Sequence, residues 1–530
     1  MVRHTRLNPL SFVGLGIAGL LTFPLAYVVY SALTGDLSQA GNLWNTRLPE
    51  LLTNTFSLAL GVSLTTLTLG VSTAWVITRY QFWGRGFWDW GFVLPLAIPS
   101  FVLAYVYTYL LDTAGPVEQA WQWLTYPEAR IPSPYSFTGA LVVMTLNTFP
   151  YVYLLARAAF QNFNLSFEEA AQATGATRWE TFFRVSLPLI RPALVASMFL
   201  VVLYVVSDFG AVSLLRFQTF TFAIYQQITG RFDYQSAALL SLLLVLFALL
   251  FVFAERWFRN QSRFYQTSGR VRTATPKPCS LAQGLAINVV FVLILGAAFG
   301  LPVLLLVQWT VSAWIQGDVG VAFGTYIGNS VFLSAIAATA ALALGTPLAY
   351  LASRFPSTLH VACLQGAYIG YVLPGPVAAL ALLMLFSTMI PILYGTVLVL
   401  IIAYLIHYLP AGLQAMESAL QQVNPNLEEA ARNLGAKGIR TFMQITFPLV
   451  RKGFSAAWLL LFLLCMKELP ATLLLRPIGF DTLAVRIWLE ASEELYQLAA
   501  PPALLIVILT IPAVFLLSKK NWQAGDASVQ

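Results

Sequence analysis

The chain has 530 residues, of which 58% are hydrophobic and only 10% are charged. Because soluble proteins carry about 25% charged residues, this composition excludes an ordinary water-soluble fold and predicts an integral membrane protein. The net charge of +7 does not indicate nucleic-acid binding, since the basic residues lie in short loops between apolar segments.

Taken in chain order, the first apolar segment follows Arg3 and Arg6 and is too long for the core of a signal peptide, so a retained span is expected. A helix that rises 1.5 Å per residue needs about 20 apolar residues to cross a bilayer. On this basis the sequence predicts twelve spans. They are 10–33, 55–77, 91–111, 138–160, 192–215, 236–255, 282–311, 328–351, 363–387, 392–413, 453–475 and 500–518.

A polar and basic segment, 257–280, follows the sixth span and is predicted to be a cytoplasmic linker. It separates a first half, 1–256, from a second half, 281–530. When the N-terminus is placed in the cytoplasm, most of the 29 Lys and Arg residues fall on the cytoplasmic side. This asymmetry follows the positive-inside rule and predicts a multi-pass protein with both termini in the cytoplasm.

The two halves repeat each other, first at an offset of 275 residues and then at an offset of 260. Because each half has an even number of spans, both halves enter the membrane from the same side, as in a parallel repeat. The expected fold is therefore all-α and polytopic, with two pseudo-symmetric six-helix halves and a translocation path between them. The matched pairs are Asn54 with Asn329, Gly70 with Gly345, Arg79 with Arg354, Pro150 with Pro410, Asp208 with Glu468, and Arg216 with Arg476.

A loop near 165–190, between spans four and five, has a counterpart near 425–450, between spans ten and eleven. Each loop reads as a short helix, a glycine turn, a second short helix, and a proline before the next span. Glycine permits a positive φ, and proline suits the first turn of a helix. An ordinary interhelical loop is the alternative, but two matched copies favour docking surfaces for a partner. The matched residues are Glu169, Ala170, Ala171, Gly175 and Pro188 in the first loop, and Glu429, Ala430, Ala431, Gly435 and Pro448 in the second.

These loops resemble the EAA motif of permease subunits in binding-protein-dependent ABC importers. The resemblance implies a type I importer permease fold in a bacterial plasma (inner) membrane. It also implies two ATP-binding-cassette ATPase subunits in contact with Glu169 and Glu429, turns shaped by Gly175 and Gly435, and a periplasmic substrate-binding protein. The fused halves and the segment 94–116 look like ferric iron permeases, so ferric iron is the expected substrate. Thiamine or another small solute is the alternative.

The chain itself is not expected to be an enzyme or to bind a cofactor. The sequence contains no Gly-Lys pair and hence no phosphate-binding loop of the ATPase type, so ATP and magnesium belong to partner subunits. A twelve-span secondary transporter of the major facilitator type is the rival. Segment 79–90, between spans two and three, lacks the basic-acidic signature of that class, and the class leaves the paired loops unexplained.

Two carboxylates are predicted inside the membrane, Asp208 in span five and Glu468 in span eleven. Intramembrane charge is costly and marks function, and broken helices recur near transport sites. Because a hard cation prefers carboxylate and phenolate oxygens, Asp208, Glu468 and Tyr204 are expected to line the path. The two carboxylates are predicted to act as transient ligands of the ferric ion.

Structural salt bridges are the alternative role for the same carboxylates. Asp208 can pair with Arg216, and Glu468 with Lys467 or Arg476. If Lys467 points into the path, its charge opposes the passage of a cation.

Overall fold

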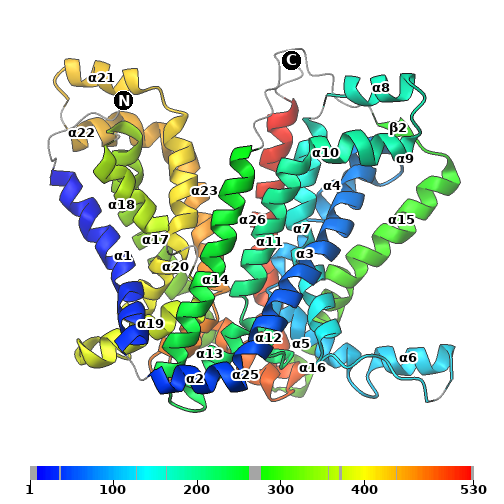
Figure 1. Ribbon diagram of the computed structural model, residues 1–530, viewed down its shortest axis with the longest axis horizontal. Coiled ribbons are helices and arrows are strands. Elements are labelled where there is room, and N and C mark those ends of the chain that lie inside the picture. The colour runs from blue at the N-terminus through cyan, green and yellow to red at the C-terminus, as the bar shows by residue number, and fades with distance from the viewer. Residues whose placement is uncertain are drawn as a thin grey trace. The chain divides into compact units, whose positions relative to one another are not determined.

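Helices make up almost all of the regular structure of the chain (Figure 1). The computed structural model describes residues 9–34, 37–126, 128–162, 164–261, 276–355, 357–368, 370, 373–436 and 438–526. Within these ranges the one sheet is a short parallel pair, β1 (Tyr80–Gln81) with β2 (Lys277–Pro278). The expected all-α membrane protein is confirmed. Residues 262–275 of the predicted linker lie outside the described residues.

Nine helical stretches in the described residues are long and apolar enough to cross a bilayer, and two bent pairs raise the number to eleven. The straight spans are α1 (Pro9–Thr34), α3 (Leu48–Arg79), α7 (Phe137–Gln161), α14 (Tyr234–Gln261), α15 (Leu281–Leu295) with η3 (Gly296–Gly300) and α16 (Leu301–Gln316), α17 (Phe323–Arg354), α20 (Val397–Gln421), α22 (Ile439–Thr441) with η6 (Phe442–Thr446) and α23 (Phe447–Met466), and α26 (Tyr496–Asp526).

The first bent pair joins α4 (Arg85–Gly91) and η1 (Leu94–Ala97) to α5 (Ser100–Leu111) at 91°. The second joins α9 (Arg178–Thr181), η2 (Phe182–Ser186) and α10 (Leu187–Leu189) to α11 (Arg191–Ser207) at 69°. The shorter elements are α2 (Leu37–Thr46), α6 (Pro116–Leu124), α8 (Ser166–Ala173), α12 (Gly210–Leu214), α13 (Phe220–Thr229), α18 (Thr358–Tyr368), α19 (Gly375–Thr388), η5 (Pro391–Leu393), α21 (Pro425–Asn433), α24 (Pro470–Leu475) and α25 (Leu483–Ser492).

Prolines break the third span of each half at matched places. Pro99 lies directly before α5, and Pro374 lies directly before α19, at the repeat offset of 275 residues. Proline has no N–H to donate and its ring clashes with the preceding turn, so a helix cannot run through these points without a kink or break. In the second half the break leaves α19 with 14 residues, and the ninth predicted span, 363–387, is divided between α18 and α19. This division accounts for eleven counted spans where twelve were expected.

The chain folds into two compact units, and each unit takes segments from both predicted halves. Unit 1 consists of Met1–Thr46, Ala223–Val245 and Gly320–Arg486, and unit 2 of Arg47–Phe222, Leu246–Val319 and Ile487–Gln530. In unit 1, α1 packs against α17, α18 and α19. In unit 2, α16 packs against α26 and α5. The first span of the first half therefore packs with helices of the second half, whereas α16 packs against α26 of its own half and α5 of the first half. The boundaries of the halves as sequence repeats stay a prediction.

Glycine allows the second and fourth spans of each half to pack closely. A Cβ on Gly70 of α3 would lie 2.7 Å from Val152 Cβ and 2.8 Å from the Tyr153 amide nitrogen of α7. In unit 1 a Cβ on Gly345 of α17 would overlap Met416 Cε of α20. Small residues at such contacts let two membrane helices approach at backbone distance, which strengthens their van der Waals packing.

Candidate functional site

The two loops predicted to dock the ATPase, near 165–190 and 425–450, are called the predicted coupling loops, and each ends its first helix in a glycine turn. Gly175 after α8 has φ +95°, and Gly435 after α21 has φ +90°. In both loops the amide of the following alanine donates back to a carbonyl five residues earlier: Ala176 to Ala171 at 3.1 Å, and Ala436 to Ala431 at 3.0 Å. This is the Schellman arrangement, whose left-handed residue is usually glycine. Nothing lies within 4 Å of a Cβ built on either glycine, so backbone conformation is what favours glycine there.

The predicted contact residues of both loops lie mostly at the surface. Glu169, Ala170, Glu429 and Ala430 are exposed, whereas Ala171 is half-buried and Ala431 is buried. Pro188 and Pro448 are exposed as well, and each sits in the first turn of a helix, α10 and α23 respectively. The exposed faces of α8 and α21 are thus available to a partner.

One position before the exposed glutamate, a second glutamate is turned inward. In unit 2, Arg79 Nη2 at the end of α3 donates to Glu168 Oε1 at 2.6 Å. The Ser186 hydroxyl, at the end of η2, donates to the same oxygen at 2.6 Å. The Arg79 side chain is 9% exposed and the Glu168 side chain 12%. A single carboxylate therefore connects α3, α8 and η2.

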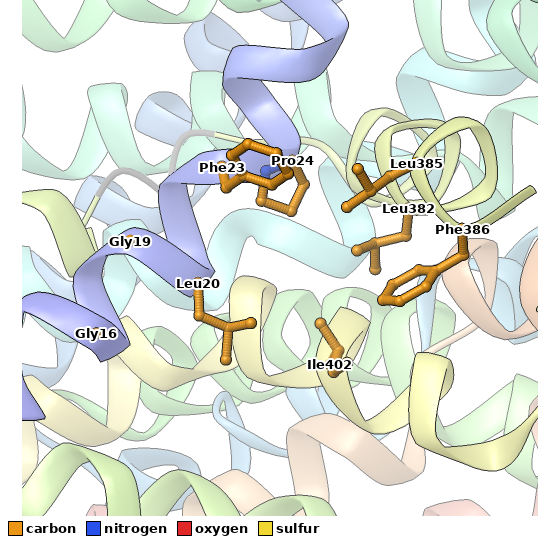
Figure 2. Close-up of a pocket in the computed structure, with 9 residues that line it drawn as sticks. All are labelled: Gly16, Gly19, Leu20, Phe23, Pro24, Leu382, Leu385, Phe386 and Ile402. Carbon is orange, nitrogen blue, oxygen red and sulfur yellow. The ribbon is translucent and has the colours of Figure 1, made fainter. Parts of the chain in front are cut away.

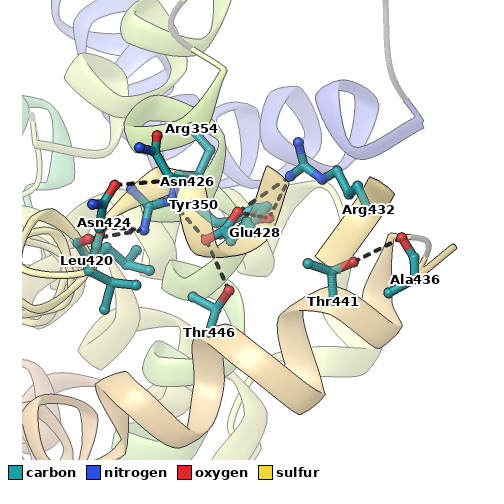
Figure 3. A network of polar contacts seen from close by, with 11 residues as sticks. Tyr350, Arg354, Leu420, Asn424, Asn426, Glu428, Arg432, Ala436, Thr441 and Thr446 are labelled. Atoms are coloured by element: carbon teal, nitrogen blue, oxygen red, sulfur yellow. Dashed lines mark hydrogen bonds and ion pairs between the residues drawn. The ribbon is translucent and has the colours of Figure 1, made fainter. Parts of the chain in front are cut away.

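The equivalent contact in unit 1 has more partners (Figure 3). Arg354 Nε and the Thr446 hydroxyl both donate to Glu428 Oε1 at 2.9 Å. The Tyr350 hydroxyl donates to Glu428 Oε2 at 2.8 Å, and Arg432 Nη2 donates to the same oxygen at 3.3 Å. The Glu428 side chain is only 2% exposed, so four side chains surround one buried carboxylate.

Sequence reasoning assigned Glu169 and Glu429 to the partner contact and missed this inward pair. The signal was present in the repeat. Arg79 matches Arg354 at an offset of 275, and the inward glutamates match at an offset of 260. A cation and an anion that both recur in two copies are candidates for an ion pair in each copy.

The predicted path carboxylate of unit 2 joins two broken helices. Asp208 Oδ1 accepts a hydrogen bond from the Ala211 amide at 2.9 Å and so caps the start of α12. Its other oxygen accepts from the Ser100 hydroxyl in the first turn of α5. The Asp208 carbonyl accepts from the Thr221 hydroxyl at 2.6 Å. Asp208 thus lies at the junction of α5, α11 and α12.

In unit 1 the same junction is built from different residues. Glu468 is 3% exposed, and its Oε1 accepts from the Ala471 amide of α24 at 3.0 Å. Its other oxygen accepts from the Tyr408 hydroxyl of α20. Gly375 stands where unit 2 has its serine, and a Cβ there would overlap Pro470 Cγ, at 2.5 Å. Glycine therefore leaves room for Pro470 in the first turn of α24, and the Tyr408 hydroxyl takes the place of the serine hydroxyl.

Tyr204 takes part in a separate contact. Its hydroxyl donates to Asn147 Oδ1 at 2.9 Å, and Asn147 Nδ2 donates to the Ile98 carbonyl at 3.0 Å. The Tyr204 hydroxyl therefore donates to an amide oxygen and not to a carboxylate.

The alternative salt bridges with arginine are not the ones that form. Arg216 Nη2 lies 3.5 Å from Glu494 Oε1, and Arg476 pairs with Asp481. Asp208 and Glu468 instead each accept from a hydroxyl and from a backbone amide. Within the described residues, no group of three or more His, Cys, Asp and Glu side chains is placed to hold a metal ion.

A cavity of about 380 Å³ lies in unit 1 between α1, α19 and α20 (Figure 2). None of its lining side chains is polar, so it offers no side-chain ligand to a cation. The lining residues are Gly16, Gly19, Leu20, Phe23, Pro24, Leu382, Leu385, Phe386 and Ile402.

Comparison with known proteins gives one family model, described as "Binding-protein-dependent transport system inner membrane component", which matches residues 66–263 and 341–518. The chain is 32% identical to the Fe(3+)-transport system permease protein FbpB 2 of Haemophilus influenzae, over 94% of this chain and 96% of that protein. It is 25% identical to the ferric transport system permease protein FbpB of Actinobacillus pleuropneumoniae, over 82% and 66%. The sulfate transport system permease protein CysT of Escherichia coli is 30% identical over 37% of this chain and 70% of that protein. Each of the two matched ranges contains one predicted coupling loop.

Proposed function

Because this chain belongs to the family of binding-protein-dependent transport system inner membrane components, with two copies fused in one polypeptide, we propose that it imports ferric iron as the permease subunit of an ATP-driven transporter. The observation that carries the proposal is the similarity to a relative named as an Fe(3+)-transport permease, which extends over 94% of this chain. Thiamine or another small solute remains the alternative cargo.

Two ATP-binding-cassette subunits dock on α8 and α21 and supply the free energy for transport. Glu169 and Glu429 lie exposed on these helices, and the turns at Gly175 and Gly435 fix where each helix ends. A periplasmic substrate-binding protein delivers the cargo from the other side of the membrane. The chain is not an enzyme in this scheme and holds no cofactor, since ATP and magnesium stay on the ATPase subunits. The chain lies in the inner membrane of a bacterium, with both termini in the cytoplasm.

Asp208 and Glu468 contact the ferric ion transiently as it passes. Each carboxylate keeps lone pairs beyond the two donors that it accepts, and both lie where helices are interrupted. Tyr204 lies one turn before Asp208 and its phenol oxygen can accept or coordinate in addition to donating. Oxygen ligands suit a hard cation.

The test of the proposed function is uptake into proteoliposomes that contain this chain, its ATPase and its binding protein. Radiolabelled ferric iron and radiolabelled thiamine are offered in parallel vesicles with ATP inside. We expect iron uptake that requires ATP, the ATPase and the binding protein together. Uptake of thiamine with no uptake of iron would replace the cargo and leave the importer assignment intact. Iron uptake without the ATPase would overturn the importer itself.

The path role of the carboxylates is tested by Asp208→Asn combined with Glu468→Gln. Each amide oxygen can still accept from the Ala211 or Ala471 amide, so the helix caps are preserved while the two charges are removed. We expect iron uptake to fall at unchanged thermal stability. Full uptake in this double variant would show that the carboxylates serve the helix junctions only.

A further inference from the structure

We propose that Glu168 and Glu428 are positioning residues, each of which clamps a coupling helix, α8 or α21, to the ends of two membrane spans. The clamps are Arg79–Glu168–Ser186 in unit 2 and Arg354–Glu428–Thr446 in unit 1. The proposal rests on the proposed function, because it assigns the route by which a movement of the ATPase reaches the spans.

The clamp residues sit at matched ends of structural elements. Arg79 and Arg354 are the last residues of α3 and α17, the second span of each half. Ser186 and Thr446 are the last residues of η2 and η6, short π-helical segments near the start of the fifth span of each half. Such π-helical segments often mark functional sites. A hydroxyl is retained in both copies although the residue changes from serine to threonine. Each carboxylate thus fixes its coupling helix to two spans at once.

The coupling helix of unit 2, α8, lies at the surface and contacts α9 and η2. α8 is eight residues long and buries none of them. A helix this short is marginal in water without tertiary contacts. The charge-assisted hydrogen bond from Arg79 to Glu168 therefore helps to orient α8, together with the Schellman turn and the contacts of α8 with α9 and η2. A force on the exposed face of α8 passes through the bond from Arg79 to Glu168 into α3.

The two clamps are unequal, and the one in unit 1 is the stiffer. Glu428 has two further donors, Tyr350 and Arg432. At the matched positions unit 2 has Trp75 and Gln172, which are not bonded to Glu168. Trp75 instead packs on Trp179 and Phe182 with ring centroids 6.2 Å and 5.2 Å apart.

Arg354 extends the clamp of unit 1 to a third span. Its Nη2 donates to the Leu420 carbonyl at 3.2 Å and to the Val423 carbonyl at 3.0 Å, at the end of α20. α17, α20, α21 and η6 are therefore bonded through one buried group.

The clamps are tested with Glu168→Gln and Glu428→Gln in the complete transporter, by measuring iron imported per ATP hydrolysed. In allosteric proteins, the coupling between two sites typically changes the affinity of one site by about 5- to 150-fold. We expect the ratio to fall about tenfold in Glu428→Gln and less in Glu168→Gln, while the ATPase stays bound and active. Wild-type ratios of iron imported per ATP in both variants would overturn the proposal, because the two glutamates would then have no role in coupling. Loss of ATPase binding would also overturn it, because the glutamates would then belong to the docking surface.

A second measurement separates the clamp from the identity of the cargo. Spin labels are placed at exposed Ser72 and Gln172 in unit 2, and at exposed Ala343 and Asn433 in unit 1, in a background without native cysteine. We expect a narrow distance within each pair that nucleotide leaves unchanged, and a broadened one after the Glu→Gln change. Unchanged distances in the variants would refute the clamp even if the wild type proved not to import iron.

Milder variants keep the test valid if Glu→Gln prevents folding. Ser186→Ala and Thr446→Val each remove one donor and leave the ion pair in place. Pairing each Glu→Gln with Arg79→Gln or Arg354→Gln removes the unpaired buried cation that a single change leaves. We expect these double variants to regain stability without regaining coupling. Recovery of the coupling ratio along with stability would count against a positioning role.

Discussion

The turn at Gly175 gives a prediction whose size can be worked out from the backbone. At φ +95° an L-residue with a Cβ is strained, and the cost in the left-handed region is about 1–2 kcal/mol. Because no atom lies within 4 Å of the Cβ position, this strain is the whole effect and no steric clash adds to it. Gly175→Ala should therefore raise the free energy of the conformation in which α8 is placed to dock by that amount. We expect the ATPase to bind this loop about 5- to 30-fold more weakly.

The assay is the affinity of the purified ATPase for the permease in nanodiscs without nucleotide, with Gly435→Ala as the matched change in unit 1. Gly175→Asn serves as the control, because asparagine tolerates the left-handed region better than alanine does. We expect the asparagine variant to bind more tightly than the alanine variant. Equal losses in the two variants, or no loss in either, would refute the conformational reasoning.

Three further predictions concern packing and buried charge. Gly70→Ala should lower the thermal unfolding midpoint in detergent more than Gly345→Ala does. A Cβ at position 70 meets the Tyr153 backbone, whereas a Cβ at position 345 meets the flexible end of Met416. Overpacking of a rigid site costs about 1–3 kcal/mol of stability, and equal shifts of the two midpoints would contradict this reasoning. Asp89→Asn should destabilise unit 2 by about 3–5 kcal/mol, because it leaves the buried Arg157 guanidinium, which donates to Asp89 at 2.5 Å, without its counter-charge. Adding Arg157→Gln should recover part of this loss of stability in the same unfolding assay. Ser100→Ala should lower the free energy of unfolding by about 1–3 kcal/mol, because one Asp208 carboxylate oxygen loses its hydroxyl donor. An unchanged unfolding midpoint would show that water replaces the hydroxyl.

Local chemistry explains which features the sequence predicted well. An apolar run has one stable arrangement in lipid, so α3, α7 and α17 each contain the span predicted for them. α20 overlaps its predicted span, 392–413, but begins and ends later. The internal repeat and its loops pointed to a fused importer permease, and two family matches confirm that assignment. The glycine turns followed from the same local argument, because a left-handed residue is a property of one position.

Features that depend on which elements become neighbours could not be predicted. An apolar run does not specify its neighbours, so nothing in 10–33 indicated that α1 packs with α18 and α19. The inward rotation of Glu168, rather than Glu169, depends on where Arg79 lies in space. The hydroxyl donor at each junction also comes from a distant segment, Ser100 in one unit and Tyr408 in the other.

In the proposed function, two duplicated loops connect this chain to its source of energy. The most direct measurement is binding-protein-dependent iron uptake by the double variant Glu169→Arg with Glu429→Arg, which reverses the charge on both exposed faces and leaves the inward glutamates intact. We predict normal insertion in the membrane, loss of ATPase binding, and uptake reduced to the level seen without ATP. Undiminished ATP-driven uptake with both loops altered would contradict the account.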